Sequence, residues 1–292
     1  MKYTLGAVIP TVQYGNLQPE IELEGDNFKE LTQEAEAYIQ EIWDKYGERP
    51  LKTNTSDAGY EGHVLETVTG EKIVFYDKGD DHYYTDMEGN VLLSGSKYAA
   101  EISPKFDRGA ILPKTAKAWD VPEDALGHLW DMAGTVSNHY GSAVHKAIET
   151  YLLYREVGEQ IMKQKELEFN YALPKNPILR ASVLSFVEAE KDLLDSKEHT
   201  LVPEAVVSDV KNKRAGQVDL LVYNADTETY QIYDFKTNHQ MDKKKLLQYQ
   251  HQLSFYAHVL NNMGLPVDSI VVYHLEEENW VKHELEVLDL QV

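Results

Sequence analysis

The sequence predicts an α/β fold, in which helices flank a central mixed β-sheet and a small N-terminal β-β-α module precedes it. Two observations predict this fold. The composition, 42% hydrophobic and 26% charged over 292 residues, is that of a folded globular protein rather than a disordered one. The second half of the chain places a helix, three strands, a helix and a further strand in succession, which is typical of a sheet covered by helices.

The chain is expected to divide into two parts. We predict an acidic N-terminal module over residues 1–55 and the main domain over residues 56–292. Polar and turn-forming residues concentrate at about 48–60, which indicates a linker there.

Within the N-terminal module, residues 3–24 have the pattern of two extended segments joined by a turn at Gly15-Asn16. Apolar residues then recur at helical spacing from Phe28 to Ile42, and Asp26 or Asn27 supplies an N-cap. This order predicts the β-β-α arrangement.

The first half of the main domain changes from strands to helices. Short strand patterns separated by turns occupy residues 61–94. Two helices are expected over residues 122–160, divided near Gly134, and an amphipathic helix is expected over residues 177–196.

The last third of the chain supplies the centre of the predicted sheet. Its strands are expected at about 200–208, 215–223, 229–236, 268–275 and 279–287. A long helix is expected at about 243–262, between the third and the fourth of these strands.

Composition excludes several classes of site. Cysteine is absent, which excludes disulfides, thiolate zinc sites, cysteine-ligated iron–sulfur clusters and cysteine nucleophiles. The net charge of −21 argues against broad nonspecific binding to nucleic acid or to anionic membranes. No basic region precedes a long apolar run, and no segment approaches the roughly 18 apolar residues of a membrane helix, so we expect an intracellular, cytoplasmic protein.

Two acids and a lysine are predicted to converge at the end of neighbouring strands. Asp219 lies in one strand, and Asp234 and Lys236 lie near the end of the next. Because residues two apart on a strand share a face, Asp234 and Lys236 project together while Phe235 points to the other side. Buried carboxylates repel one another, and a divalent cation relieves that conflict. Oxygen ligands suit Mg²⁺ or Mn²⁺.

These residues belong to a longer series of motifs, which in chain order are Gly141-x-x-x-His145, Gly216-x-x-Asp219, Asp234-Phe235-Lys236 and Gln252-x-x-x-Tyr256. The series resembles the PD-(D/E)XK nuclease superfamily and, within it, the RecB-like branch with its phage-type exonucleases. The resemblance covers about residues 80–292 and implies a restriction-endonuclease-like core. Four cysteines hold an iron–sulfur cluster in some members of the branch, and this chain lacks them. No proline of the kind in the superfamily name precedes Asp219, and no Walker motif occurs.

The resemblance implies a role for each motif residue. The implied metal ligands are His145, Asp219, Asp234 and the main-chain carbonyl of Phe235, holding one or two Mg²⁺ or Mn²⁺ ions. The implied catalytic residues are Asp219, Asp234, Lys236, Gln252 and Tyr256. Lys236 would orient or help deprotonate the attacking water, and Gln252 and Tyr256 would shape the site and touch the DNA backbone. The implied activity is a metal-dependent DNA exonuclease that leaves 5′-phosphates, in phage-type recombination or repair within a bacterial host cytoplasm.

Several alternatives stay open at this point. The same scaffold suits a structure-specific or sequence-specific endonuclease, or a catalytically inactive acidic interaction protein. Glu204 is either an outer ligand of the metal or a surface carboxylate, and Lys243–Lys245 are either a solvated helix start or a DNA contact. The acidic module is an embellishment, a docking site for a protein partner, or a contact in a homo-oligomer.

Overall fold

The computed structural model falls into two units, Met1–Gly59 and Tyr60–Val292. The residues that it describes are 2–6, 9–11, 15–17, 20–24, 61–78, 81–103, 106–166, 170–277 and 279–290. The helix expected from Phe28 to Ile42 and the linker expected at about 48–60 lie outside the described residues.

The described part of the N-terminal unit contains two antiparallel strand pairs. β1 (Lys2–Gly6) pairs with β4 (Glu20–Glu24), and β2 (Ile9–Thr11) pairs with β3 (Gly15–Leu17). The turn predicted at Gly15-Asn16 is therefore wrong, because both residues lie in β3 and pair with β2. Strand pairing overrides the local preference of these residues for turns.

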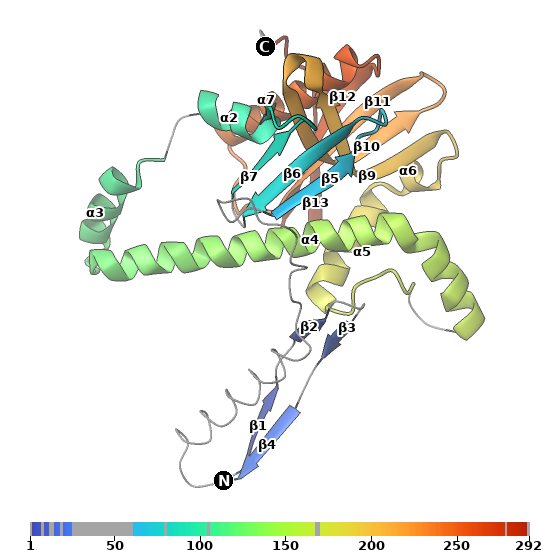
Figure 1. Ribbon diagram of the computed structural model, residues 1–292. Helices are drawn as coiled ribbons and strands as arrows, with labels where there is room; N and C mark the ends of the chain where they lie inside the picture. The colour runs from blue at the N-terminus through green and yellow to red at the C-terminus, as the bar shows by residue number, and fades with distance from the viewer. Residues whose placement is uncertain are drawn as a thin grey trace. The chain divides into compact units, whose positions relative to one another are not determined.

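A nine-stranded mixed sheet organises the described part of the second unit (Figure 1). In spatial order its strands are β13 (Asn279–Leu285), β12 (Val267–Glu276), β11 (Thr229–Lys236), β10 (Arg214–Asn224), β8 (Val91–Ser94), β7 (Asp81–Thr85), β6 (Lys72–Lys78) and β5 (Glu61–Glu66). β9 (His199–Asp209) pairs with β10 off this path. The pairs β10·β8 and β11·β12 are parallel and the others are antiparallel, which confirms the predicted mixed sheet.

Helices lie on both sides of this sheet. The described helices are α2 (Gly95–Ile102), α3 (Arg108–Trp119), α4 (Glu123–Lys165), α5 (Pro177–Ala189), α6 (Lys191–Asp195) and α7 (Lys243–Asn262). An apolar cluster joins α4, α5 and α6 to one face of the sheet through Val144, Ile148, Val183, Phe186, Leu193, Phe235 and Tyr273. A second cluster joins α7 to the other face through Leu253, Phe255, Leu221, Ile232 and Val272. Within the described residues, none of the helices combines the length and the apolar character needed to cross a membrane.

Two of the predicted helices have different limits in the structure. α4 continues through Gly134 for 43 residues, so the predicted division there is wrong. One glycine in a helix interior costs only about 1 kcal/mol relative to alanine, which the rest of a long packed helix offsets. The helix predicted over residues 177–196 is two helices, α5 and α6, which meet at Glu190.

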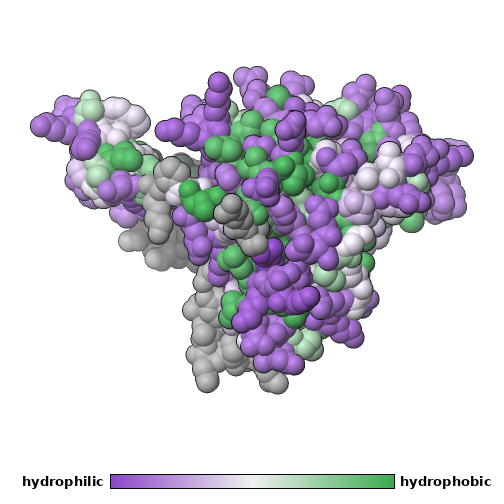
Figure 2. Space-filling model, turned by 90° about the horizontal axis from the view of Figure 1, so that it is seen from above, coloured by the Kyte–Doolittle hydropathy of each residue, from purple (hydrophilic) through white to green (hydrophobic). Residues whose placement is uncertain are grey.

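The N-terminal half of α4 and the shorter α3 extend away from the sheet together (Figure 1). Arg108 joins them, because its Nη2 donates to Asp131 Oδ2 at 3.0 Å and to the carbonyl of Gly127 at 3.0 Å. Apolar side chains remain exposed on this arm, with Trp119 64% and Leu129 61% exposed. In Figure 2 the arm shows green apolar atoms among purple hydrophilic ones. The C-terminal half of α4 packs on the sheet and carries His145.

Candidate active site

The candidate site lies where two central strands separate. Antiparallel pairing between β10 and β11 runs from Asn224 and Thr229 to Leu220 and Tyr233, and then stops. The other end of β10 pairs with β8 instead. Asp219 is the first residue past the last pair, and its Oδ2 accepts the backbone N–H of Phe235 at 2.7 Å. The Asp219 carboxylate therefore replaces a backbone partner of β11 and lies in the fork between the strands.

β11 brings Asp234 and Lys236 to this fork. Asp234 Oδ2 lies 2.6 Å from Lys236 Nζ, and Phe235 packs on the opposite face against Phe186. Asp234 is only 5% exposed. Burial raises the pKa of the Asp234 carboxyl, and Lys236 partly offsets this rise. The pKa of Lys236 is raised, because the carboxylates of Asp234 and Asp219 outweigh the effect of burial. The fork thus holds a buried ion pair.

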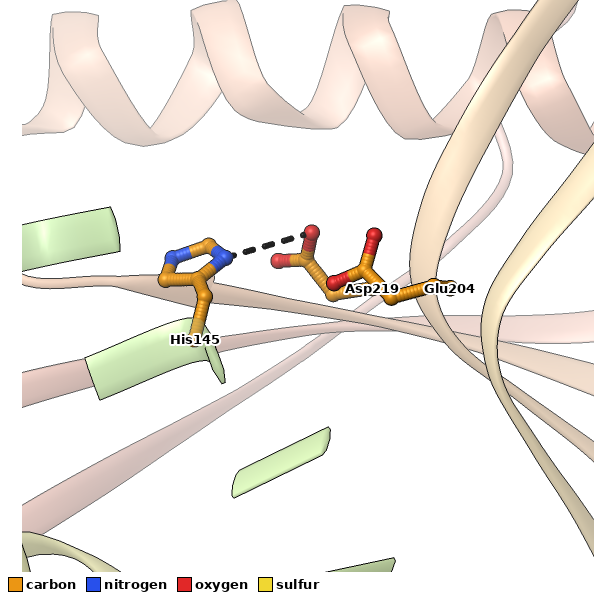
Figure 3. A group of neighbouring side chains, drawn as sticks. All are labelled: His145, Glu204 and Asp219. Carbon is orange, nitrogen blue, oxygen red and sulfur yellow. Dashed lines mark ion pairs between the residues drawn. The ribbon is translucent and has the colours of Figure 1, made fainter. Parts of the chain in front are cut away.

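α4 supplies the imidazole through a close approach to the end of β11. A Cβ added at Gly141 would lie 2.9 Å from Thr237 Oγ1, so glycine permits this approach. His145 lies one helical turn further along the same face of α4. Its Nδ1 is 3.4 Å from Asp219 Oδ1 (Figure 3). In the motif Gly141-x-x-x-His145, the glycine therefore lets the helix dock and the histidine reaches the fork.

Glu204 completes the cluster from β9. The register pairs Val218 with Ala205 and Leu220 with Pro203, which places Glu204 opposite Asp219. Donor atoms of His145, Glu204 and Asp219 all lie within 4.8 Å of one another (Figure 3). Of the two interpretations open for Glu204, the structure therefore supports a position at the site. The sequence signal is weak, since it consists of one acid between the apolar residues of β9.

The electrostatics of this cluster show that its carboxylates favour a nearby positive charge. Burial and the neighbouring Asp219 carboxylate raise the pKa of Glu204 to about 7. Burial opposes a proton on His145, but Asp219 outweighs it and raises the pKa of His145 to about 9. Buried carboxylates that face one another are stabilised by a bound cation. Carboxylate oxygens and one imidazole are a donor set that fits Mg²⁺ or Mn²⁺, so the residues present suit the predicted metal.

Gln252 and Tyr256 lie on α7, and the Tyr256 ring packs against β10. Tyr256 is 4% exposed, and its hydroxyl is within hydrogen-bonding reach of Gln252. A Cβ added at Gly216 would lie 2.2 Å from the Tyr256 ring, and one added at Gly95 would lie 2.7 Å from it. Both glycines thus allow the close approach of the ring. The contact expected between Gln252, Tyr256 and the DNA backbone stays a prediction. In the structure the Tyr256 ring is buried and packs against Gly216 of β10.

The fork opens to solvent through a recess beside α4. The recess has a volume of about 560 Å³ and is lined by Ser137, Asn138, Gly141, Ser142, His145, Lys146, Glu149, Glu204 and Thr237. A neighbouring recess of about 680 Å³ shares Ser137 and Thr237 with it. Lys146 pairs with Glu149 at 2.8 Å on the rim. A substrate chain can therefore reach the cluster along α4.

A mixed sheet with helices on both faces, whose central strands carry Asp219 and Asp234-x-Lys236 at a fork, defines the α/β proteins with a restriction-endonuclease-like fold. A family model described as the PD-(D/E)XK nuclease superfamily matches residues 124–287, more than half of the 292 residues. The chain belongs to this superfamily, as the sequence motifs predicted.

Two further comparisons complete this result. Among solved structures, the crystal structure of SSO0001 matches this chain with 13% sequence identity and a TM-score of 0.27. The match covers 50% of this chain and 68% of the SSO0001 chain. The comparison with curated proteins found no match.

Proposed function

We propose that this protein is a divalent-metal-dependent DNA exonuclease of the RecB-like branch, which leaves 5′-phosphates and acts in phage-type recombination or repair. The observation that carries the proposal is the convergence of Asp219, Asp234, Lys236 and His145 at one fork of the sheet. Membership of a superfamily of nucleases supports phosphodiester bonds as the substrate.

His145, Asp219 and Glu204, whose donor atoms lie within 4.8 Å of one another, would hold the metal. Asp234 and the main-chain carbonyl of Phe235 would be its further ligands. A bound Mg²⁺ or Mn²⁺ ion would polarise the scissile phosphate and would lower the pKa of water. The cation is needed in this chain in particular, because the carboxylates of the cluster and a net charge of −21 repel an approaching phosphodiester.

Lys236 is the water-orienting group of the proposal, because its raised pKa keeps it a protonated ammonium. Its Nζ lies in the fork beside Asp234 and faces the Tyr249 ring at 4.7 Å, so its position is held from two sides. The oxygen of water attacks phosphorus and loses one proton, and the bond from phosphorus to the 3′-oxygen breaks as the 3′-oxygen takes up one proton, which leaves a 5′-phosphate and a 3′-hydroxyl. The ammonium of Lys236 offsets the negative charge that develops on the phosphoryl oxygens.

The test of this function compares two DNA substrates. We expect the protein to degrade end-labelled linear DNA in Mg²⁺ or Mn²⁺, to leave covalently closed circular DNA intact, and to lose all cleavage in EDTA. Cutting of the closed circle would assign an endonuclease in place of the exonuclease. If neither substrate is cut with either ion, the chain is an inactive interaction protein and the proposal fails.

The choice of metal depends on the imidazole. We expect Mn²⁺ to support cleavage at least as well as Mg²⁺, because Mn²⁺ accepts a nitrogen ligand more readily. Replacement His145→Ala is expected to lower cleavage with both ions and to lower the ratio of the Mn²⁺ rate to the Mg²⁺ rate. The control is His128→Ala, which changes an exposed histidine of the same helix. Equal rates for His145→Ala and wild type in both ions would remove His145 from the metal site.

A further inference from the structure

Gln217 contacts the cluster through Glu204, although it is not one of the motif residues. It lies on β10, two residues before Asp219. Its Nε2 donates to Glu204 Oε2 at 2.7 Å and lies 3.3 Å from the main-chain carbonyl oxygen of Glu204. One amide group therefore binds both the side chain and the backbone of Glu204.

Glu204 is a residue whose conformation requires such support. Its φ is 52°, in the left-handed region that residues other than glycine seldom adopt, and it lies in the middle of β9. The alternation of side chains between the two faces of the sheet also breaks at this position. Leu201 packs with the cluster under α4 and Val202 packs with the cluster under α7, whereas past Glu204 the side chain of Ala205 joins the α7 cluster out of the expected alternation. The chain thus turns at Glu204, and its carboxylate lies with His145 and Asp219.

A neutral amide suits this position better than a charged group. A lysine in place of Gln217 would neutralise Glu204 and compete with a cation, and a glutamate would add a further negative charge beside the carboxylates of Glu204 and Asp219. The amide N–H donates a hydrogen bond to Glu204 and adds no charge to the site.

We propose that Gln217 is a positioning residue, which orients the Glu204 carboxylate toward a divalent cation held with His145 and Asp219. This inference rests on the proposed function, because it concerns the same metal site. Gln217 does not touch the cation and acts only through Glu204.

The test measures binding of Mn²⁺ to the metal-free protein by calorimetry, so that it does not depend on cleavage. Gln217→Met keeps the length of the side chain and removes the donor. We expect it to weaken Mn²⁺ binding about 10- to 100-fold, the usual effect of losing a group that orients a metal ligand. The matched control is Gln250→Met, which removes a hydrogen bond to the carbonyl of Glu286 on the outer side of α7. This control is expected to bind Mn²⁺ like the wild type.

A double-mutant cycle separates positioning from a general structural effect. The background is Glu204→Gly, because glycine adopts the left-handed conformation without strain and removes the carboxylate. In this background Gln217→Met is expected to cause no further loss of Mn²⁺ affinity, since the group that it orients is gone. Wild-type affinity in Gln217→Met, or the same loss in both backgrounds, would overturn the inference alone. Absence of Mn²⁺ binding by the wild type would overturn the proposed function with it.

Discussion

Replacing Asp234 with asparagine is expected to slow DNA cleavage on the order of 10³-fold, because a metal ligand contributes several kcal/mol and each 1.36 kcal/mol corresponds to a factor of ten. The substitution keeps the shape of a side chain that is 5% exposed and removes its charge. It also ends the ion pair with Lys236, in which the two groups lie 2.6 Å apart. Single-turnover cleavage of end-labelled linear DNA in Mg²⁺ measures the effect.

The control for this variant is Asp268→Asn. Asp268 is an exposed residue of β12 that accepts a hydrogen bond from Thr229 Oγ1 at 2.8 Å, at the end of the strands away from the fork. It is expected to cleave DNA at the wild-type rate. A thermal melt with and without Mn²⁺ gives an independent readout, because a ligand that binds the folded state raises the melting temperature. We expect Mn²⁺ to stabilise the wild type and Asp268→Asn more than Asp234→Asn. Cleavage by Asp234→Asn within tenfold of wild type, about 1.4 kcal/mol, would contradict a role at the metal.

Replacing Gly216 with alanine is expected to lower the free energy of unfolding by about 1–3 kcal/mol, which is the usual cost of overpacking a core. The added Cβ would lie 2.2 Å from the buried ring of Tyr256, against which Gly95 also packs. The ring cannot move away without disturbing α7. For a domain of this size the melting temperature falls by roughly 2–4 °C per kcal/mol. Cleavage is expected to fall as well, because Asp219 lies three residues further along the same strand.

Two comparisons distinguish this contact from a general effect of replacing glycine. Gly134 lies in the exposed part of α4, and a Cβ added there would have no neighbouring side chain or other element within 4 Å. Gly134→Ala is therefore expected to leave the free energy of unfolding unchanged or to raise it by up to about 1 kcal/mol. In a Tyr256→Ala background, Gly216→Ala is expected to lower the free energy of unfolding much less than in the wild type, because the two residues in contact are coupled. If denaturant unfolding shows that Gly216→Ala lowers the free energy of unfolding equally in both backgrounds, the contact with Tyr256 is not the cause of the destabilisation.

The central strands could be predicted from the sequence because their residues alternate and turns separate them. The strands expected at 200–208, 215–223, 229–236, 268–275 and 279–287 agree with the observed strands within one or two residues. Alternation also predicted that Asp234 and Lys236 would face together while Phe235 packs on the opposite side, and the structure has this arrangement. A period of two is a local property of the backbone, so it needs no knowledge of the rest of the fold.

Local preferences misled where longer-range contacts prevail. A break between two helices was expected at Gly134, but α4 is continuous there. A turn was expected at Gly15-Asn16, but both residues lie in β3. In each case the local cost of an unfavourable residue is small beside the hydrogen bonds and packing of the whole element. The position of Glu204 could not be predicted either, because it depends on the register of β9 against β10.

By itself the sequence determined the α/β class, the superfamily motifs and a donor set without cysteine, since each depends on residue identity and on short spacings along the chain. Only the tertiary structure decided that Glu204 joins His145 and Asp219, that Gln217 binds Glu204, and that the Tyr256 ring packs against Gly216 and Gly95. These contacts join residues from different strands and helices. Their distances are set by strand register and by the docking of α4 and α7 on the sheet, which no short stretch of sequence contains.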